Sequence, residues 1–160
     1  MSLLQSAEAI GLELTSRLVA VRTANGCETD IGASVFRGKR AVDRDQIPCV
    51  AIVEGNDEVD ELDTRGMTTP RVEATITQQY VLIAYTTCDP TNPNDAAHAA
   101  IRDMKRAVFR TEGKPDRTLG RKVKRVRYRG RDIGPRADGE AFVAAVLEVA
   151  VEYVEDIANP

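Results

Sequence analysis

The stretch that decides the fold is Arg71–Thr87, with the sequence RVEATITQQYVLIAYTT. It is rich in β-branched residues and tyrosine, which favour strands. Residues 72–77 alternate between apolar and polar side chains, as they do in a strand with one buried face. The alternation slips near Gln78 and Gln79, which predicts a bend or bulge at that point. We therefore expect one long strand over 71–87.

Two shorter strand candidates precede this stretch, Ile31–Phe36 and Pro48–Val53. The second is continuously apolar, as in strands that are covered on both faces. The residues from Glu54 to Pro70 are polar and include two glycines, so we expect a long acidic excursion there that is mobile or used for contacts. Its carboxylates crowd into ten positions: Glu54, Asp57, Glu58, Asp60, Glu61 and Asp63.

Two segments have apolar residues at helical spacing. The first runs over residues 3–21, with Ser2 as a possible N-cap. The second follows the turn-forming stretch Cys88–Asp95, takes Asn94 or Asp95 as its N-cap, and ends near Gly113.

Arg121 to Arg131 alternates basic and apolar residues, which predicts a strand with an exposed basic side. Side chains two residues apart share a face of a strand. We therefore expect four guanidinium groups on one face, those of Arg125, Arg127, Arg129 and Arg131.

The last element, Glu140–Glu155, fits both a strand and a helix, because its apolar residues align at either period. Its five valines and the Asp138-Gly139 turn before it favour a strand. Strands then arrive in runs instead of alternating with helices. The order predicts one α+β domain over residues 1–160, a mostly antiparallel β-sheet with two helices packed on one face.

Composition describes an ordinary globular chain, with 42% hydrophobic and 29% charged residues and no apolar run long enough to span a membrane. Charge is unevenly distributed, although the net charge is only −3. Residues 101–136 carry 14 Lys and Arg against 4 Asp and Glu, and the rest of the chain is strongly acidic. Such a division suits contact between the basic surface of one copy and the acidic surface of the next, or contact with a polyanion. A solvated acidic loop explains the acidic run equally well.

Several kinds of chemistry lack their residues. The three cysteines form no CxxC pair, and His98 is the only histidine, so we expect no disulfide framework, zinc ribbon or multi-histidine metal site. The glycine-rich loops that bind phosphates and the GxSxG nucleophile motif do not occur. We expect no enzyme activity, no cofactor and no metal. His98 is expected at a helix surface or an interface.

In element order and in particular stretches the chain resembles the tail terminator (tail completion) proteins of long-tailed bacteriophages. The stretches are IGASVFRG, the strand before the acidic excursion, RVEATITQQYVLIAYTT, PNDAAHAAIRDMKRAVFR and KVKRVRYRGRDIGPRADGEAFVAAVLEVAVEYVE. The resemblance covers nearly the whole chain and implies that the last element is a strand. It also implies a hexameric ring that caps the tail tube, ends tail polymerisation and joins the tail to the head-side connector.

The resemblance implies a structural virion protein, assembled in the host cytoplasm, with DNA passing through its ring without sequence-specific binding. Alternatives are a head-tail connector or neck protein and a nucleic-acid-binding domain that uses the strand 121–131. A sheet edge or apolar patch, such as one on Glu140–Glu155, is expected to supply much of the ring contact. The candidate contact residues are Arg121, Arg125, Arg127, Arg129 and Arg131, and Asp57, Glu58, Asp60, Glu61 and Asp63.

Overall fold

The computed structural model describes residues 4–39, 41–65 and 71–160. Its main element is a five-stranded sheet in the order β1-β2-β3-β7-β6. β1 pairs parallel to β2, and every other neighbouring pair is antiparallel. The strands are β1 (Val35–Arg37), β2 (Cys49–Arg65), β3 (Arg71–Thr87), β6 (Arg125–Ile133) and β7 (Phe142–Asp156).

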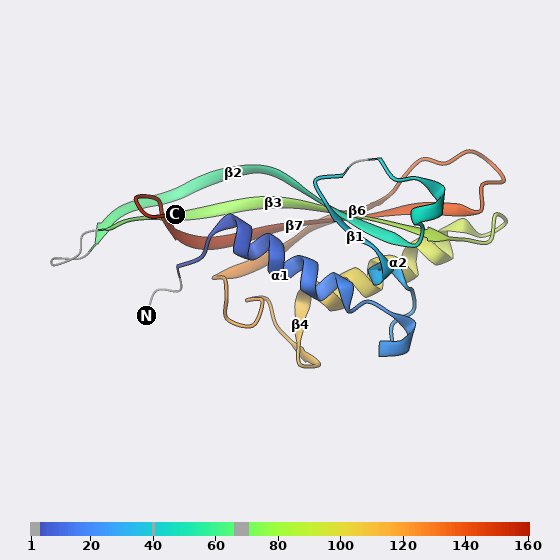
Figure 1. Cartoon of the computed structure of the whole chain (residues 1–160), viewed down its shortest axis with the longest axis horizontal. Helices are drawn as coiled ribbons and strands as arrows, with labels where there is room; N and C mark the ends of the chain where they lie inside the picture. Colours follow the sequence, from blue (N-terminus) through green and yellow to red (C-terminus); the bar gives the residue numbers. More distant parts are fainter. Residues whose placement is uncertain (1–3, 40, 66–70) are drawn as a thin grey trace.

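Two helices, α1 (Ala7–Val19) and α2 (Pro93–Phe109), lie on the same side of this sheet, as Figure 1 shows. We call that side the helix face and the other side the open face. The helix face carries the core, in which apolar residues of α1 and α2 pack on alternate residues of the strands. This α+β architecture confirms the predicted fold class. In the described part of the chain, neither helix has the length and apolar character needed to cross a membrane.

β3 and β7 form the centre of the sheet. They pair without a register shift from Glu73–Asp156 to Thr87–Phe142. The bounds of β3 are those the sequence predicts, and the ambiguous last element is a strand. Its residues Val143, Ala145, Leu147, Val149, Val151 and Tyr153 are all buried. β7 lies between β3 and β6, and β6 pairs with it from Ala145 to Glu152, so the expectation that Glu140–Glu155 is an edge of the sheet is wrong.

The helix boundaries differ from those predicted. The α1 N-cap is Ser6, whose hydroxyl accepts a hydrogen bond from the Ala9 N–H, and Ser2 lies outside the described residues. The α2 N-cap is Asn92, not Asn94 or Asp95, because Pro93 occupies the first helical position, where proline needs no N–H partner.

The first strand candidate divides into a 3₁₀ turn, Ile31–Ala33, and the short strand β1. The Gly32 N–H donates to the Val21 carbonyl. A Cβ atom at Gly32 would lie 2.4 Å from the Leu18 carbonyl oxygen, so only glycine allows this approach to the end of α1. The turn therefore replaces the first half of the expected strand.

The predicted acidic excursion is a strand as far as the structure describes it. β2 continues through Glu54 to Arg65 and pairs with β3 along its whole length, ending at Arg65 opposite Arg71. The hairpin of β2 and β3 extends beyond the start of α1 (Figure 1). Polar side chains suggested a loop, but an edge strand beyond the helices exposes its side chains and gains its backbone bonds from one neighbour. Residues 66–70 of the expected excursion lie outside the described residues.

The predicted irregularity at Gln78 and Gln79 belongs to the neighbouring strand. β3 keeps its register with β7 throughout, whereas β2 has an extra residue between Glu54 and Asp57. Gln78 lies on the helix face and is buried. Its side-chain amide donates to the Gly55 carbonyl at 2.6 Å, so a polar residue on the core side compensates for the bulge in β2.

Candidate interaction surfaces

Residues 54–65 of β2, which we call the acidic arm, carry the five predicted acidic contact residues. Pairing with β3 places Asp57 on the helix face, opposite Gln78, and Glu58 on the open face, opposite Thr77. Asp63 pairs with Glu73, also on the open face, and the backbone of Glu61 pairs with Thr75. The structure describes the backbone of Glu61 but not its side chain.

Asp60 is the extra residue of a second bulge, between Val59 and Glu61. Its carboxylate accepts a hydrogen bond of 2.6 Å from the Thr77 hydroxyl, which holds it on the open face. The open face of the arm therefore collects Glu58, Asp60 and Asp63, whereas the sequence alone gave no division of these carboxylates between faces.

The helix face of the arm carries exposed apolar side chains. Val59 is 62% exposed and Leu62 is 59% exposed, because the helices do not reach this part of the hairpin.

Nearby, burial and the charges of Glu155, Asp57 and Glu54 raise the pKa of Tyr153 to about 12. Burial also raises the pKa of Tyr80, and Glu54 adds to the effect. Both tyrosines are thus neutral hydroxyls beside the arm's carboxylates.

Arg125 and Arg127 lie on the open face of β6, the strand at the other edge of the sheet. Both contact Glu152 of β7, with Arg127 Nη2 at 2.8 Å from its carboxylate and Arg125 Nη2 at 3.4 Å. About half-exposed ion pairs of this kind stabilise a fold by only about 0–1 kcal/mol. The guanidinium groups remain accessible from solvent, since each is more than 40% exposed.

The other two arginines of β6 do not share that face. A register shift between Tyr128 and Gly130 leaves Arg129 as the extra residue of a bulge. Beyond the bulge Arg131 pairs with Leu147, on the helix face. There its Nη1 lies 2.7 Å from Nδ1 of His98, on α2. The predicted row of four guanidinium groups on one face is therefore wrong, because the bulge changes the alternation of side chains.

Arg121 lies outside the strand, since β6 begins only at Arg125. It has a left-handed backbone, with φ of 68°, in the loop that joins β5 (Lys114–Pro115) to β6. We call residues 110–124 the basic loop, because six of them are Lys or Arg. All six are exposed: Arg110, Lys114, Arg117, Arg121, Lys122 and Lys124.

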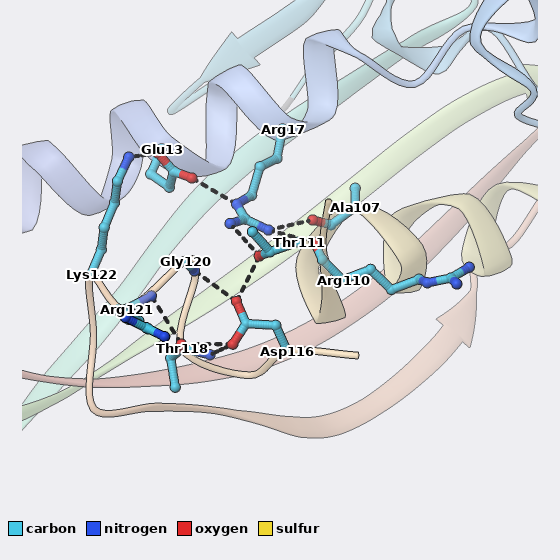
Figure 2. A network of polar contacts seen from close by, with 10 residues as sticks. All are labelled: Glu13, Arg17, Ala107, Arg110, Thr111, Asp116, Thr118, Gly120, Arg121 and Lys122. Atoms are coloured by element: carbon cyan, nitrogen blue, oxygen red, sulfur yellow. Dashed lines mark hydrogen bonds and ion pairs between the residues drawn. The ribbon is translucent and has the colours of Figure 1, made fainter. Parts of the chain in front are cut away.

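A network of polar contacts fixes the basic loop to α1 and α2 (Figure 2). Arg17 of α1 donates to the Arg110 carbonyl at 2.8 Å, to the Ala107 carbonyl at 3.2 Å and to the Thr111 hydroxyl at 2.9 Å. Glu13 accepts from both Arg17 and Lys122. Burial acts to raise the pKa of Glu13, but these two cations outweigh it and lower that pKa.

Asp116 organises the loop from within. Its carboxylate accepts hydrogen bonds from the hydroxyls of Thr111 and Thr118, both at 2.6 Å, and from the Gly120 N–H at 2.7 Å. These bonds, the Thr111 bond foremost, hold its pKa well below the ordinary range of an aspartate. One ionised carboxylate is thus used to shape the loop, and the loop's cations project into solvent.

No family model and no curated protein matches this chain.

Both edges of the sheet are available for contact. β1 covers the outer side of β2 only opposite Val50, Ala51 and Ile52, so the acidic arm has no other strand beside it among the described residues. β6 is the last strand on the other side. The acidic arm and β6 therefore lie at opposite edges of one sheet.

Sequence reasoning missed three features of these surfaces: the contact of Arg131 with His98, the stacking of Lys105 on Tyr128 at 4.6 Å from the ring centre, and the Arg17–Asp116 network. The first two join α2 to β6, and no local pattern predicts which helix lies beside which strand. The Asp-x-Thr spacing of Asp116 and Thr118 was a visible sign of a side-chain-bonded turn.

Proposed function

We propose that this chain is a structural protein that assembles head to tail into a closed ring and caps the tail tube of a long-tailed bacteriophage. In this role the ring ends tube polymerisation and joins the tail to the head-side connector. The resemblance in sequence pattern supplies the biological setting. The protein requires no catalysis for this role and acts through its surfaces.

One observation supports the ring most strongly: the two edges of the sheet have opposite charge. A patch that binds a different patch on the next copy makes a heterologous contact, and repeated heterologous contacts either close a ring or continue as a filament. The acidic arm and β6 are such a complementary pair, located on opposite sides of the same subunit.

The basic loop is a second surface suited to the role. Its six exposed cations are held in place by the Arg17–Asp116 network. A rigid basic surface beside α1 and the end of α2 fits a partner with an acidic rim, such as a tube end or a connector. The head-tail connector alternative uses the same surfaces and differs only in where the ring sits.

The nucleic-acid alternative loses its main support. It depended on four guanidinium groups tracking phosphates from one strand face. Arg125 and Arg127 instead contact Glu152, and Arg131 lies on the other face beside His98.

The test is electron microscopy of purified tail tubes mixed with the protein. We expect ring-shaped density at one end of each tube and arrest of further tube growth when tube subunits are added. Growth at an undiminished rate, with the protein absent from tube ends, would refute the proposal. Binding to isolated portal or connector rings but not to tubes would favour the connector alternative.

A further inference from the structure

We propose that neighbouring copies join by strand addition: β6 of one copy pairs antiparallel with the acidic arm of the next, so that the sheets continue around the ring. This inference rests on the proposed function, because it names the contact from which the ring is made. The occupant of each free edge is therefore a second copy of this chain.

Strand direction permits this pairing. β2, β3, β7 and β6 are antiparallel to their neighbours in turn, so β6 runs opposite to β2. Rotation about a ring axis preserves the direction of each strand relative to that axis. The β2 strand of the next copy therefore continues the alternation when it lies beside β6.

The backbone groups at both edges also match. On β2 the Val50 N–H donates outward to Ser34, and the Ile52 carbonyl accepts from Gly38. Val50 and Ile52 have their side chains on the helix face. The register with β3 gives Asp57, Val59 and Leu62 of the arm the same arrangement, with side chains on the helix face and backbone N–H and C=O groups pointing outward.

On β6 the Val126 N–H points outward, to the Arg117 carbonyl at 2.6 Å, and the Val126 side chain lies in the core on the helix face. The register gives Tyr128, Arg131 and Ile133 the same orientation. On both edges, the backbone N–H and C=O groups that point outward belong to residues whose side chains lie on the helix face. Pairing them keeps the helices of all copies on one side of the continuous sheet, as a closed ring needs.

Charge makes this pairing selective. An edge strand that carries charges and bulges resists pairing with arbitrary strands. The open face of the arm presents Glu58, Asp60 and Asp63. The open face of the free part of β6 presents Arg127 and Asp132, with Arg129 at the bulge. Cross-strand pairs of opposite charge stabilise a sheet, and like charges opposite each other destabilise it. Pairing of β6 with the arm is therefore favoured by opposite charges, whereas two arms repel each other.

The free parts of the two edges are offset along the sheet. The basic loop covers the start of β6 at Val126, and β1 covers β2 up to Ile52. The pairing therefore involves β6 from Arg127 to Ile133 and the part of β2 beyond Val53. Closed sheets have such a stagger between strands, because their strands tilt relative to the barrel axis.

The first test exchanges the charges of the two edges. One variant combines Arg127→Gln with Arg129→Glu, a second combines Glu58→Lys with Asp63→Lys, and a third carries all four changes. Self-association is measured by sedimentation over a concentration series. We expect the first two to raise the apparent dissociation constant about tenfold or more, and the third to restore association, since its edges are again complementary.

The control for this test is Glu8→Lys with Asp45→Lys, which reverses two acidic charges, as the second variant does, at exposed positions away from both edges. It is expected to leave the dissociation constant within about twofold of the unmodified chain. Equal weakening by the control and the edge variants, or failure of the fourfold variant to recover, would overturn the pairing.

The second test addresses the backbone. Val59→Pro removes an outward N–H but no bond to β3, and Val59 is 62% exposed, so the subunit should keep its melting temperature while association is lost. Val59→Thr is the matched control, which keeps the N–H and should associate normally. Hydrogen exchange should slow at Asp57, Val59 and Leu62 on assembly.

The outcomes separate this inference from the proposed function. Rings that respond to these variants but never bind tail tubes would retain the pairing and refute the tube-capping role. Rings on tube ends that are unaffected by Val59→Pro and the charge exchange would retain the role and refute the pairing. A chain that stays monomeric at every concentration and on tubes would refute both.

Discussion

The side-chain amide of Gln78 on β3 donates a hydrogen bond of 2.6 Å to the carbonyl of Gly55 on β2, across the first bulge of the acidic arm. The same amide contacts the carbonyl of Gln79 at 3.1 Å. One buried polar side chain thus pairs two carbonyl groups where the ladder between β2 and β3 is interrupted.

Replacing Gln78 with leucine should therefore destabilise the protein. Leucine fills a similar volume but leaves the Gly55 carbonyl without its partner, a loss of about 1–3 kcal/mol. Urea denaturation measures the change, with Thr87→Ala at the exposed end of β3 as the control. An unchanged denaturation midpoint for Gln78→Leu would show that the hydrogen bond does not stabilise the bulge.

Replacing Arg17 with lysine should loosen the basic loop while preserving the charge of α1. A lysine ammonium cannot reproduce the planar arrangement of donors that contacts Ala107, Arg110 and Thr111 together. We expect a loss of about 1–3 kcal/mol and faster hydrogen exchange across residues 110–124. Arg22→Lys, at an exposed ion pair, is the control and should change neither quantity. Exchange that accelerates equally throughout the chain would contradict a local role.

Asp116→Asn should change how stability depends on pH. The folded protein lowers the pKa of Asp116 below that of the unfolded chain, so its ionised form stabilises the fold above the unfolded pKa of about 3.9. That contribution is lost as the pH falls toward the lower folded pKa. The variant should be less stable at neutral pH, and its deficit should shrink as the solution is acidified below about pH 4. Denaturation at several pH values, with Asp138→Asn as the control, tests this. A loss of stability that is the same at every pH would contradict this expectation.

Gly130→Ala should destabilise the bulge in β6. Gly130 has a φ of 151°, which residues with a side chain rarely adopt, although no atom would collide with an added Cβ. The cost is therefore conformational and about 1 kcal/mol or more. Arg129→Ala, at the neighbouring exposed position, is the control. Thermal unfolding measures both, and stabilisation by Gly130→Ala would show that the bulge is dispensable.

Much of the fold was predictable because its central strands carry strong local patterns. Residues 72–77 of β3 alternate apolar and polar side chains, and the last strand has apolar residues at every second position from Val143 to Tyr153. The bounds of β3 are those predicted. The acidic arm could not be recognised as a strand, since its pairing with β3 depends on backbone groups and not on apolar side chains. The 3₁₀ turn at Ile31 likewise depends on the close approach of Gly32 to α1.

The candidate contact residues were predictable as two charged groups but not as surfaces. Counting charges located the acidic and basic segments, and Asp57 and Arg125 do lie on strands at opposite edges. Their division between faces follows from three bulges, at Glu54–Asp57, Val59–Glu61 and Tyr128–Gly130. A bulge leaves little trace in composition, and each one changes the face of every later residue relative to simple alternation.

The location of these bulges also determines where the chain can change length. Removing Asn56, Asp60 or Arg129 would delete a residue that has no partner of its own across the ladder, so all later side chains would keep their present faces. Removing one residue from the interior of β7, such as Ala150, would turn every later side chain over and expose the core. Single-residue deletions are therefore tolerable at the bulges of the acidic arm and of β6, and damaging within β3 and β7. A descendant of this gene could reshape its contact edges by losing codons at the bulges while its core stays the same.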